Sequence, residues 1–322
     1  VDNEIDHEYL LRYLKDECGL TQIRHNTQGA VRDSLKYKGL ENIEIPLPPI
    51  DDQIRITTLL NKVESLIAKR KKSIADLDEL LKSTFLEMFG DPVRNEMGWE
   101  FSTVAEFCKT VIDCPHKTPI YSDDNTKLYC VRSSDIVNGY LELSETKQVD
   151  VGVFEDRILR HLPQRDDILY CREGGRLGNA ARIISNDKIC LGQRIMLFDV
   201  NDKHRSHFVW ALLESFSFKK KVNSLIGGGG APRINIKDIK NIKTIKPPLD
   251  IQNKFATIVQ KVESIKDRYQ KSLNDLENLY GTLSQKVFKG ELDLSRIPLK
   301  KEAEPPQEMI EPQIQETVKE PQ

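Results

Sequence analysis

Arginine and amide side chains gather beside glycine-rich turns in the second half of this sequence. Arg172 precedes the run Gly174-Gly175-Arg176-Leu177-Gly178, and a second turn reads Gly192-Gln193-Arg194. Glycine lets the backbone approach a large partner closely. Arginine can donate two hydrogen bonds to guanine or to a phosphate, and asparagine or glutamine can pair similarly with adenine. Any one of these residues could be a solvated surface group, but together they favour nucleic-acid contact by Arg172, Arg176, Asn179, Arg182, Gln193 and Arg194.

The charge of the whole chain does not indicate a nucleic-acid partner, because 48 Lys and Arg stand against 50 Asp and Glu in 322 residues. The distribution of charge is uneven, however. Residues 96–164 hold seven Lys/Arg and twelve Asp/Glu, whereas residues 165–245 hold fifteen and eight. Since phosphates attract cations, the second segment is the better candidate for contact with a duplex.

The sequence lacks the motifs of several catalytic activities. No GxxxxGK[ST] loop is present, because Gly227-Gly228-Gly229-Gly230 is followed by Ala231-Pro232 instead of a lysine. We find no Asn-Pro-Pro-Tyr or Asp-Pro-Pro-Tyr segment and no nuclease-like set of carboxylates and lysine. The six cysteines show no CxxC spacing, so we expect reduced thiols in a cytosolic protein, with no metal site and no cofactor. These observations favour a binding protein over an enzyme.

A long helix after Pro46-Leu47-Pro48-Pro49 is the first element that must position these residues. The prolines predict an extended entry, because a residue before proline avoids helical geometry. Apolar side chains then recur at alternating steps of four and three, until Gly90 and Pro92 end the helix. Such a heptad pattern buries one narrow stripe against a partner helix. The expected seam includes Leu60, Val63, Ile67, Ile74, Leu77 and Leu81.

The same pattern recurs 199 residues later in the chain. Pro247-Pro248-Leu249-Asp250-Ile251-Gln252 matches residues 48–53, and another heptad helix follows. The shared offset indicates a duplication, so we predict that the helices near 51–89 and 250–289 pair with each other. Lys266 is compatible with a seam position if its charged end reaches solvent. The second seam is expected to include Val259, Val262, Leu273, Leu276 and Leu283.

The rest of the chain divides around these two helices. Residues 93–245 are expected to form the one complete globular domain, with strand patterns at 127–132, 140–143, 167–170 and 194–198. Residues 1–45 match the segment that precedes the second helix. Residues 298–322 are rich in Glu, Pro and Gln, which is typical of a disordered tail. No apolar run approaches the ~20 residues of a membrane span, so no membrane partner is expected.

Several of these segments resemble the specificity (S) subunits of type I restriction-modification systems. The matching pieces around the helices are Ile45-Pro46-Leu47-Pro48-Pro49-Ile50, Met88-Phe89-Gly90-Asp91-Pro92 and their counterparts near 247 and 288. Within 93–245, the run from Tyr129 to Ile136 and the run Asp166-Asp167-Ile168-Leu169 resemble strands of that family's recognition domain, where many members carry Gly at the position of Asp166. The candidate DNA-binding set also includes Arg132, Ser133, Ser134 and Arg233.

The resemblance implies an α+β fold. A mixed-sheet DNA target recognition domain (93–245) would be joined to a central (46–92) and a C-terminal (246–297) conserved helical region, which pair as an antiparallel coiled coil. It also implies a non-catalytic specificity subunit in a prokaryotic cytoplasm. This subunit would bind double-stranded DNA, read half of a bipartite target, and recruit methyltransferase and restriction/translocase subunits.

Residues 1–45 would be the C-terminal remnant of a first recognition domain. The chain would then be a fragment, which we favour, or a half-length subunit that forms a homodimer. In either case Tyr9, Leu10, Tyr13 and Leu14 would lack a core unless a partner covered them.

Two other functions remain open from the sequence. The chain could be the C-terminal recognition part of a fused restriction-methylation enzyme, which methyltransferase motifs upstream of Val1 would reveal. It could also be a coiled-coil scaffold that binds no nucleic acid. The target bases cannot be read from the sequence, since base choice depends on loop geometry.

Overall fold

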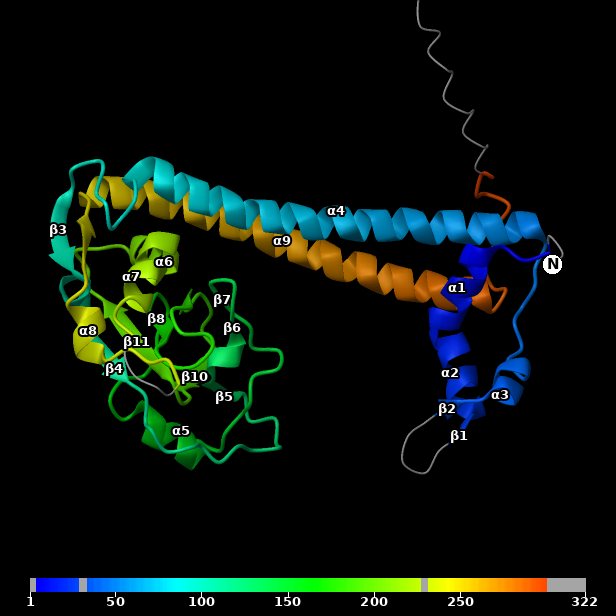
Figure 1. The fold of residues 1–322 in the computed structure, drawn as a ribbon, viewed down its shortest axis with the longest axis horizontal. Helices are drawn as coiled ribbons and strands as arrows, with labels where there is room; N and C mark the ends of the chain where they lie inside the picture. The colour runs from blue at the N-terminus through cyan, green and yellow to red at the C-terminus, as the bar shows by residue number, and fades with distance from the viewer. Residues whose placement is uncertain (1–3, 29–33, 227–230, 300–322) are drawn as a thin grey trace, which may run out of the picture. The chain divides into compact units, whose positions relative to one another are not determined.

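The computed structural model describes residues 4–28, 34–226 and 231–299. The glycine run 227–230 and residues 300–322 of the expected disordered tail lie outside the described residues. The chain consists of two compact units: unit 1 is Val1–Lys72 with Gln270–Gln322, and unit 2 is Ser73–Tyr269. Two long helices, α4 (Ile50–Phe89) and α9 (Leu249–Phe288), each contribute to both units (Figure 1).

The shorter elements combine helices and strands. Unit 1 contains α1 (His7–Lys15), α2 (Glu17–Asn26), β1 (Thr27–Gln28), β2 (Ser34–Leu35) and α3 (Tyr37–Glu41). The strands of unit 2 are β3 (Glu100–Thr103), β4 (Cys108–Asp113), β5 (Leu128–Val131), β6 (Ile136–Val137), β7 (Tyr140–Leu141), β8 (Ile168–Cys171), β9 (Ala180–Arg182), β10 (Lys188–Leu191), β11 (Ile195–Val200) and β12 (Lys243–Lys246). Its shorter helices are η1 (Val104–Phe107), η2 (Ser133–Asp135), α5 (Val151–Ile158), α6 (Ser206–Glu214), α7 (Phe216–Asn223) and α8 (Ile236–Lys240). The predicted α+β class is confirmed.

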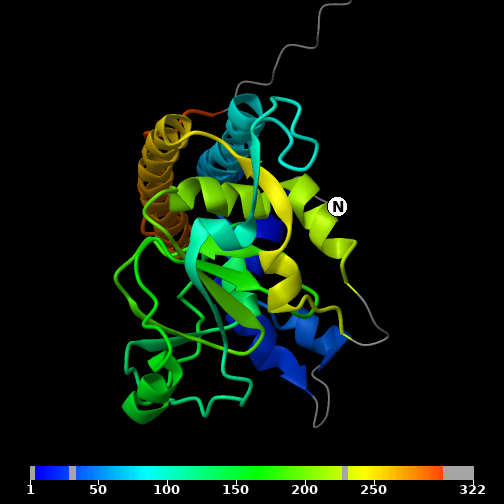
Figure 2. The same ribbon diagram turned by 90° about the vertical axis from the view of Figure 1, so that its left-hand side faces the viewer.

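The two long helices pack side by side and antiparallel (Figures 1 and 2). In unit 1, Ile56 near the start of α4 lies in one apolar cluster with Phe288 at the end of α9. In unit 2, the rings of Phe85 and Phe89 near the end of α4 lie 5.8 and 5.3 Å from that of Phe255 near the start of α9. The start of each helix therefore meets the end of the other, which confirms the predicted antiparallel pair.

The predicted seam positions on both helices are all buried or partly buried. The buried face is wider than predicted at the end of α4, where Phe85 and Phe89 are 2% and 0% exposed. Lys266 also differs from the expectation, because its ammonium lies 2.7 Å from the Asp78 carboxylate and 3.5 Å from the centre of the Tyr140 ring. An ion pair and a cation–π contact therefore help to accommodate this charge in the seam, where the Lys266 side chain is 20% exposed.

Unit 1 has a small core where α1 packs on the ends of the long helices. Tyr9 and Tyr13 are 1% and 2% exposed, and their rings lie 5.6 and 5.4 Å from that of Phe288. Their hydroxyls donate to the carbonyls of Pro46 and Glu44. The expectation that these tyrosines would lack a core without a partner is wrong, because α4 and α9 supply that core.

The offset of 199 residues extends to the short helices. The bounds of α1, α3 and α4 lie 199 residues before those of α6, α8 and α9. Gln53 and Gln252 are the equivalent fully buried residues at the starts of the long helices. Each amide donates at 2.8 Å to the carbonyl five residues earlier and accepts from the backbone N–H of Asp6 or Arg205. Each glutamine thus ties the start of a short helix to the start of a long one.

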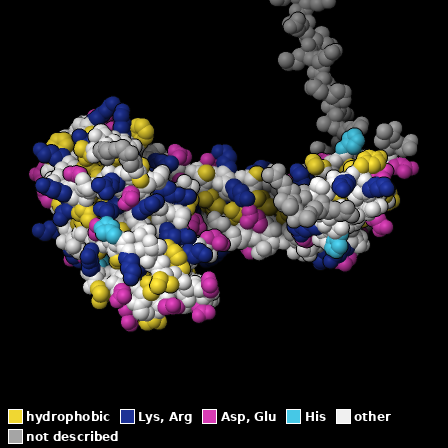
Figure 3. All heavy atoms as spheres, turned by 60° about the horizontal axis from the view of Figure 1, so that its bottom comes forward, with side chains coloured by type: hydrophobic (Ala, Val, Ile, Leu, Met, Phe, Trp, Pro, Cys, Tyr) yellow, Lys and Arg dark blue, Asp and Glu magenta, His cyan; other side chains and the backbone are white. Residues whose placement is uncertain are grey.

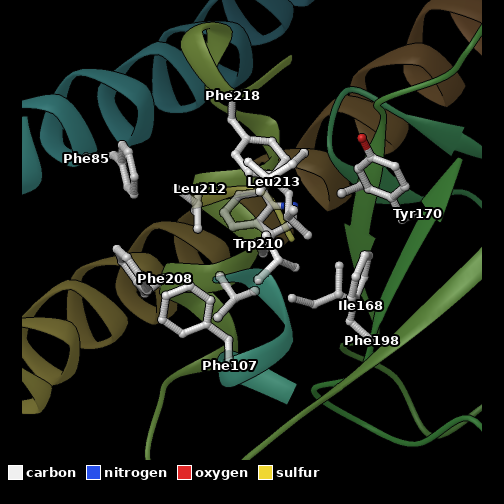
Figure 4. Packing of buried hydrophobic residues seen from close by; sticks show 14 of the residues in the cluster. Phe85, Phe107, Ile168, Tyr170, Phe198, Phe208, Trp210, Leu212, Leu213 and Phe218 are labelled. Carbon is white, nitrogen blue, oxygen red and sulfur yellow. The ribbon is translucent and has the colours of Figure 1, made fainter. Parts of the chain in front are cut away.

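A four-stranded antiparallel sheet in the order β4-β11-β8-β9 forms the centre of unit 2. All four residues of β8 are buried, because both faces of the sheet are covered. One face packs against Phe208, Leu212 and Phe218 of α6 and α7, as Figure 4 shows. The other face packs against β5 and β10, which form a separate parallel pair. Unit 2 therefore contains both parallel and antiparallel strand pairs.

Among the described residues, no helix is long and apolar enough to cross a membrane.

Candidate nucleic-acid interface

Several loops of unit 2 meet at one edge of the four-stranded sheet. Because neighbouring strands run antiparallel, the ends of β4 and β8 and the start of β11 lie at this edge. Backbone hydrogen bonds join the loops: the N–H of Arg172 donates to the Arg194 carbonyl at 2.9 Å, and that of Gly174 to the Pro232 carbonyl at 2.8 Å. We call these loops the loop edge, which comprises residues 113–118, 131–135, 172–179, 191–194 and 231–234.

The loop edge is cationic and its turns are tightly placed. It carries six Lys or Arg and three Asp or Glu residues, and Figure 3 shows many Lys and Arg side chains over the face of unit 2 that it displays. A Cβ at Gly192 would lie 2.3 Å from the Val131 carbonyl oxygen, so the close approach of these two strands requires glycine. Gly174 has φ +88°, and a Cβ there would lie 3.4 Å from the Arg194 guanidinium. Gly174 and Gly192 therefore determine the backbone conformation of the turns that carry these arginines.

Arg194 and Arg233 have guanidinium groups without close internal partners. The Arg194 side chain is 54% exposed, and its contact with the Glu173 carboxylate is 3.9 Å long. Its backbone has φ +69°, a region that residues other than glycine rarely adopt and that recurs at binding sites. Arg233 is exposed, and its side chain has no hydrogen-bond partner within the described residues. Both groups are therefore available to an external acceptor.

Three other predicted arginines belong to the loop edge but are held by internal contacts. Arg172 lies 3.3 Å from the Asp113 carboxylate, and Arg132 donates to the Asp135 carboxylate at 2.9 Å. Arg176 donates to two backbone carbonyls at 3.0 and 3.2 Å. These internal contacts leave the three guanidinium groups less available to an external acceptor than those of Arg194 and Arg233.

Polar uncharged groups complete the loop edge. The Gln193 amide donates to the His116 carbonyl at 2.6 Å and to the Thr118 hydroxyl at 3.1 Å. Ser134 is exposed and Ser133 is half-buried beside it. Sequence reasoning selected Gln193 but missed the loop that it anchors, because no pattern in the sequence connects Gln193 with residues 116–118, more than 70 positions earlier.

Two other predicted residues, Arg182 and Asn179, contact side chains that lie outside the loop edge. Arg182 ends β9 at the opposite edge of the sheet and is 5% exposed. Its guanidinium donates to Asp166 at 2.5 Å and to both carboxylate oxygens of Glu263 on α9 at 2.6 and 2.7 Å. A buried charge needs such partners, so Arg182 attaches β9 to α9, and we leave it out of the proposed interface. Asn179 is half-buried, with its oxygen 3.4 Å from the Lys219 ammonium.

The loop edge presents guanidinium, amide and hydroxyl groups, which suit recognition by hydrogen bonds and charge. Burial raises the pKa of the Cys114 thiol, and it raises that of Cys171 to about 12, so both thiols stay protonated near neutral pH. Within the part of the chain that the structure describes, no group of three His, Cys, Asp or Glu side chains could hold a metal ion.

Comparison with known proteins assigns a family. The model of the type I restriction modification DNA specificity domain matches residues 1–78 and 96–278, which is most of the chain. The chain belongs to this family. It is 26% identical over 311 residues to the type I restriction enzyme MjaIX specificity subunit of Methanocaldococcus jannaschii, with 90% of this chain and 70% of that protein covered.

Other members of the specificity-domain family are more distant. The type I restriction enzyme StySPI specificity subunit of Salmonella potsdam is 22% identical over 309 residues, which cover 89% of this chain and 66% of that protein. A chain from a structure described for complex assembly and conformational transition of the type I R-M system superposes with a TM-score of 0.55. That chain is 17% identical, and the match covers 88% of this chain and 71% of that chain. This likeness supports the fold.

Proposed function

We propose that this chain is the DNA-binding specificity subunit of a type I restriction-modification complex in the prokaryotic cytoplasm, without catalytic activity of its own. The observation that carries the proposal is the loop edge, where two available guanidiniums stand on tightly fixed turns of a specificity-domain fold. The fused-enzyme alternative is not favoured, because the relatives described above are specificity subunits.

In this proposal unit 2 contacts one half of a bipartite target with its loop edge. Arg194 and Arg233 would reach base edges or phosphates, with Gln193 and Ser134 beside them. An arginine that donates two hydrogen bonds to guanine discriminates between bases, whereas one that meets a phosphate strengthens binding to every sequence. The strained, fixed backbone of Arg194 suits the first role, because two parallel hydrogen bonds require a set direction.

Replacing Arg194 by alanine is expected to weaken binding of the target duplex by about 1–3 kcal/mol and to leave binding of unrelated duplexes nearly unchanged. Fluorescence anisotropy titrations at several salt concentrations measure both effects. The matched control is Lys203→Ala, which removes an exposed cation from the turn at the opposite end of β11. If Arg194→Ala and Arg233→Ala both bind every duplex like the parent at every salt concentration, the loop edge is not the DNA-contacting surface.

The partners of this subunit would include methyltransferase and restriction/translocase subunits, and a second apolar stripe on the long helices supports a docking surface for the methyltransferase. Within unit 1 the stripe lies beside the seam, and it comprises Leu59 and Leu66, seven residues apart on α4, and Leu279 on α9. Leu66 and Leu279 are 44% and 45% exposed. A helix with apolar residues beyond one narrow seam is typical of packing against further helices.

Substitution of Leu66 by glutamate is expected to abolish co-purification with the methyltransferase subunit, because a charge would enter an apolar helix interface. Ala68→Glu is the control, since Ala68 is exposed on the opposite side of the same helical turn. Pull-down of both variants from cells that express the partner measures the difference. Equal recovery of the partner with Leu66→Glu and Ala68→Glu would exclude this docking surface.

A further inference from the structure

We propose that Arg157 of α5 is a positioning residue that holds two loops of the loop edge in the arrangement needed to discriminate DNA sequences. The inference rests on the proposed function and assigns a role to a residue that the sequence did not single out. Arg157 is 8% exposed, so it does not present its guanidinium to DNA. It acts through the loops that it binds.

The guanidinium of Arg157 joins two segments that are far apart in sequence. Its Nη1 donates at 2.5 Å to the carbonyl of Leu191, the last residue of β10, and its Nη2 donates at 2.5 Å to the carbonyl of Lys117, in the loop after β4. Leu191 leads directly into Gln193 and Arg194. The planar fork of an arginine can span two carbonyls at once, which a lysine ammonium does less rigidly.

A second link connects the same two segments. The Gln193 amide donates to the carbonyl of His116 and to the hydroxyl of Thr118, the residues on either side of Lys117. The turn that carries Arg194 and the loop after β4 are therefore fixed to each other at two points. Loss of the buried hydrogen bonds of Arg157 would leave only the exposed hydrogen bonds of Gln193, for which water competes.

The burial of Arg157 is energetically unusual. Among the described residues no ion pair with a carboxylate is formed by its guanidinium, and its hydrogen bonds go to neutral carbonyls. A buried charge without an opposite charge is unfavourable, so stability alone would be served better by an apolar side chain. The segment does not need Arg157 as an anchor, because Phe154 of α5 packs with Leu128, Val149 and the cysteines of β5 and β10. This combination favours a role in positioning over one in folding.

The test uses Arg157→Gln, which keeps a polar side chain but replaces the charged guanidinium fork with one shorter, neutral amide, and Arg157→Lys, which keeps the charge. Arg160→Gln, which removes an exposed arginine just after the same helix, is the control. With the methyltransferase partner present, anisotropy titrations compare the target duplex with unrelated duplexes. We expect Arg157→Gln to bind the target about 10-fold more weakly, to bind unrelated duplexes within 2-fold of the parent and to keep the salt slope. The affinity of Arg157→Lys for the target duplex should lie between that of the parent and that of Arg157→Gln.

A purely structural role would instead lower binding to all duplexes together. An unchanged ratio of target to unrelated binding in folded Arg157→Gln would overturn the proposal. Failure of Arg157→Lys to fold would overturn it as well. Hydrogen exchange provides a readout that does not depend on DNA: the amides of 116–118 and 192–194 should exchange faster in Arg157→Gln, with the rest of unit 2 unchanged. If the parent protein does not discriminate between duplexes at all, the proposed function fails, and hydrogen exchange still decides whether Arg157 positions the loops.

Discussion

Phe85→Ala is expected to lower the free energy of unfolding by about 3–5 kcal/mol, the usual loss for a fully buried phenylalanine. Phe85 is 2% exposed, and its ring lies 5.1 Å from that of Phe89, 6.0 Å from that of Phe208 and 5.8 Å from that of Phe255. These rings come from α4, α6 and α9 (Figure 4 shows Phe85 and Phe208). Removing Phe85 leaves a cavity where α4 and α9 pack against α6 within unit 2.

Urea unfolding followed by circular dichroism measures this loss. The control is Leu86→Ala, because Leu86 is the next residue of α4 and is 52% exposed, so its truncation should change stability by less than about 0.5 kcal/mol. A loss below about 1 kcal/mol for Phe85→Ala would contradict the packing of α6 against the helix pair.

Acidification is expected to destabilise the protein through His207 of α6. His207 is 6% exposed, and neither ring nitrogen has a hydrogen-bond partner among the residues that the structure describes. Burial, with a smaller contribution from the nearby Arg182 guanidinium, lowers the pKa of His207 to about 4. In the unfolded chain the pKa of histidine is about 6.5. Below pH 6.5 the unfolded state therefore takes up a proton that the folded state does not, and the stability associated with neutral His207 is lost as pH falls towards 4.

The loss would reach about 1.4 kcal/mol per pH unit, or about 3 kcal/mol by pH 4. His207→Gln removes this titration, so the difference in unfolding free energy between parent and variant should change with that slope between pH 6.5 and 4 and become constant below. His25→Gln is the control, because His25 is exposed. Parallel curves for the parent and His207→Gln would show that His207 does not titrate as its burial requires.

The helix pair could be predicted from the sequence because its signal is local and repeated. Heptad steps place Leu60 and Val63 on one stripe in any helix, and the offset of 199 residues identifies the partner stripe. Phe85 was missed because the heptad steps after Leu77 and Leu81 place Thr84, and not Phe85, in the seam. It is buried because α6 covers a second face of the pair, and a contact between three elements leaves no periodic pattern.

The candidate site was predictable in part. Glycine-rich turns located Arg194 and Gln193, because close backbone approach requires glycine at defined positions such as Gly192. The same reasoning could not separate Arg194 from Arg182, although the first is exposed and the second is bound to carboxylates. The partner that buries Arg182, Glu263, is 81 residues away on α9. Charge pairing of this kind depends on tertiary structure, and so do the contacts of Arg157.

Methylome sequencing tests the central claim most directly, since it identifies the methylated target sequence in cells that express this protein and its partners. The proposal predicts a bipartite methylated motif, and it predicts that Arg194→Ala relaxes or shifts bases in one half of that motif while the other half stays the same. Lys203→Ala should leave the whole motif unchanged. An identical motif in the parent, Arg194→Ala and Arg233→Ala would contradict the assignment of the loop edge as the surface that reads DNA.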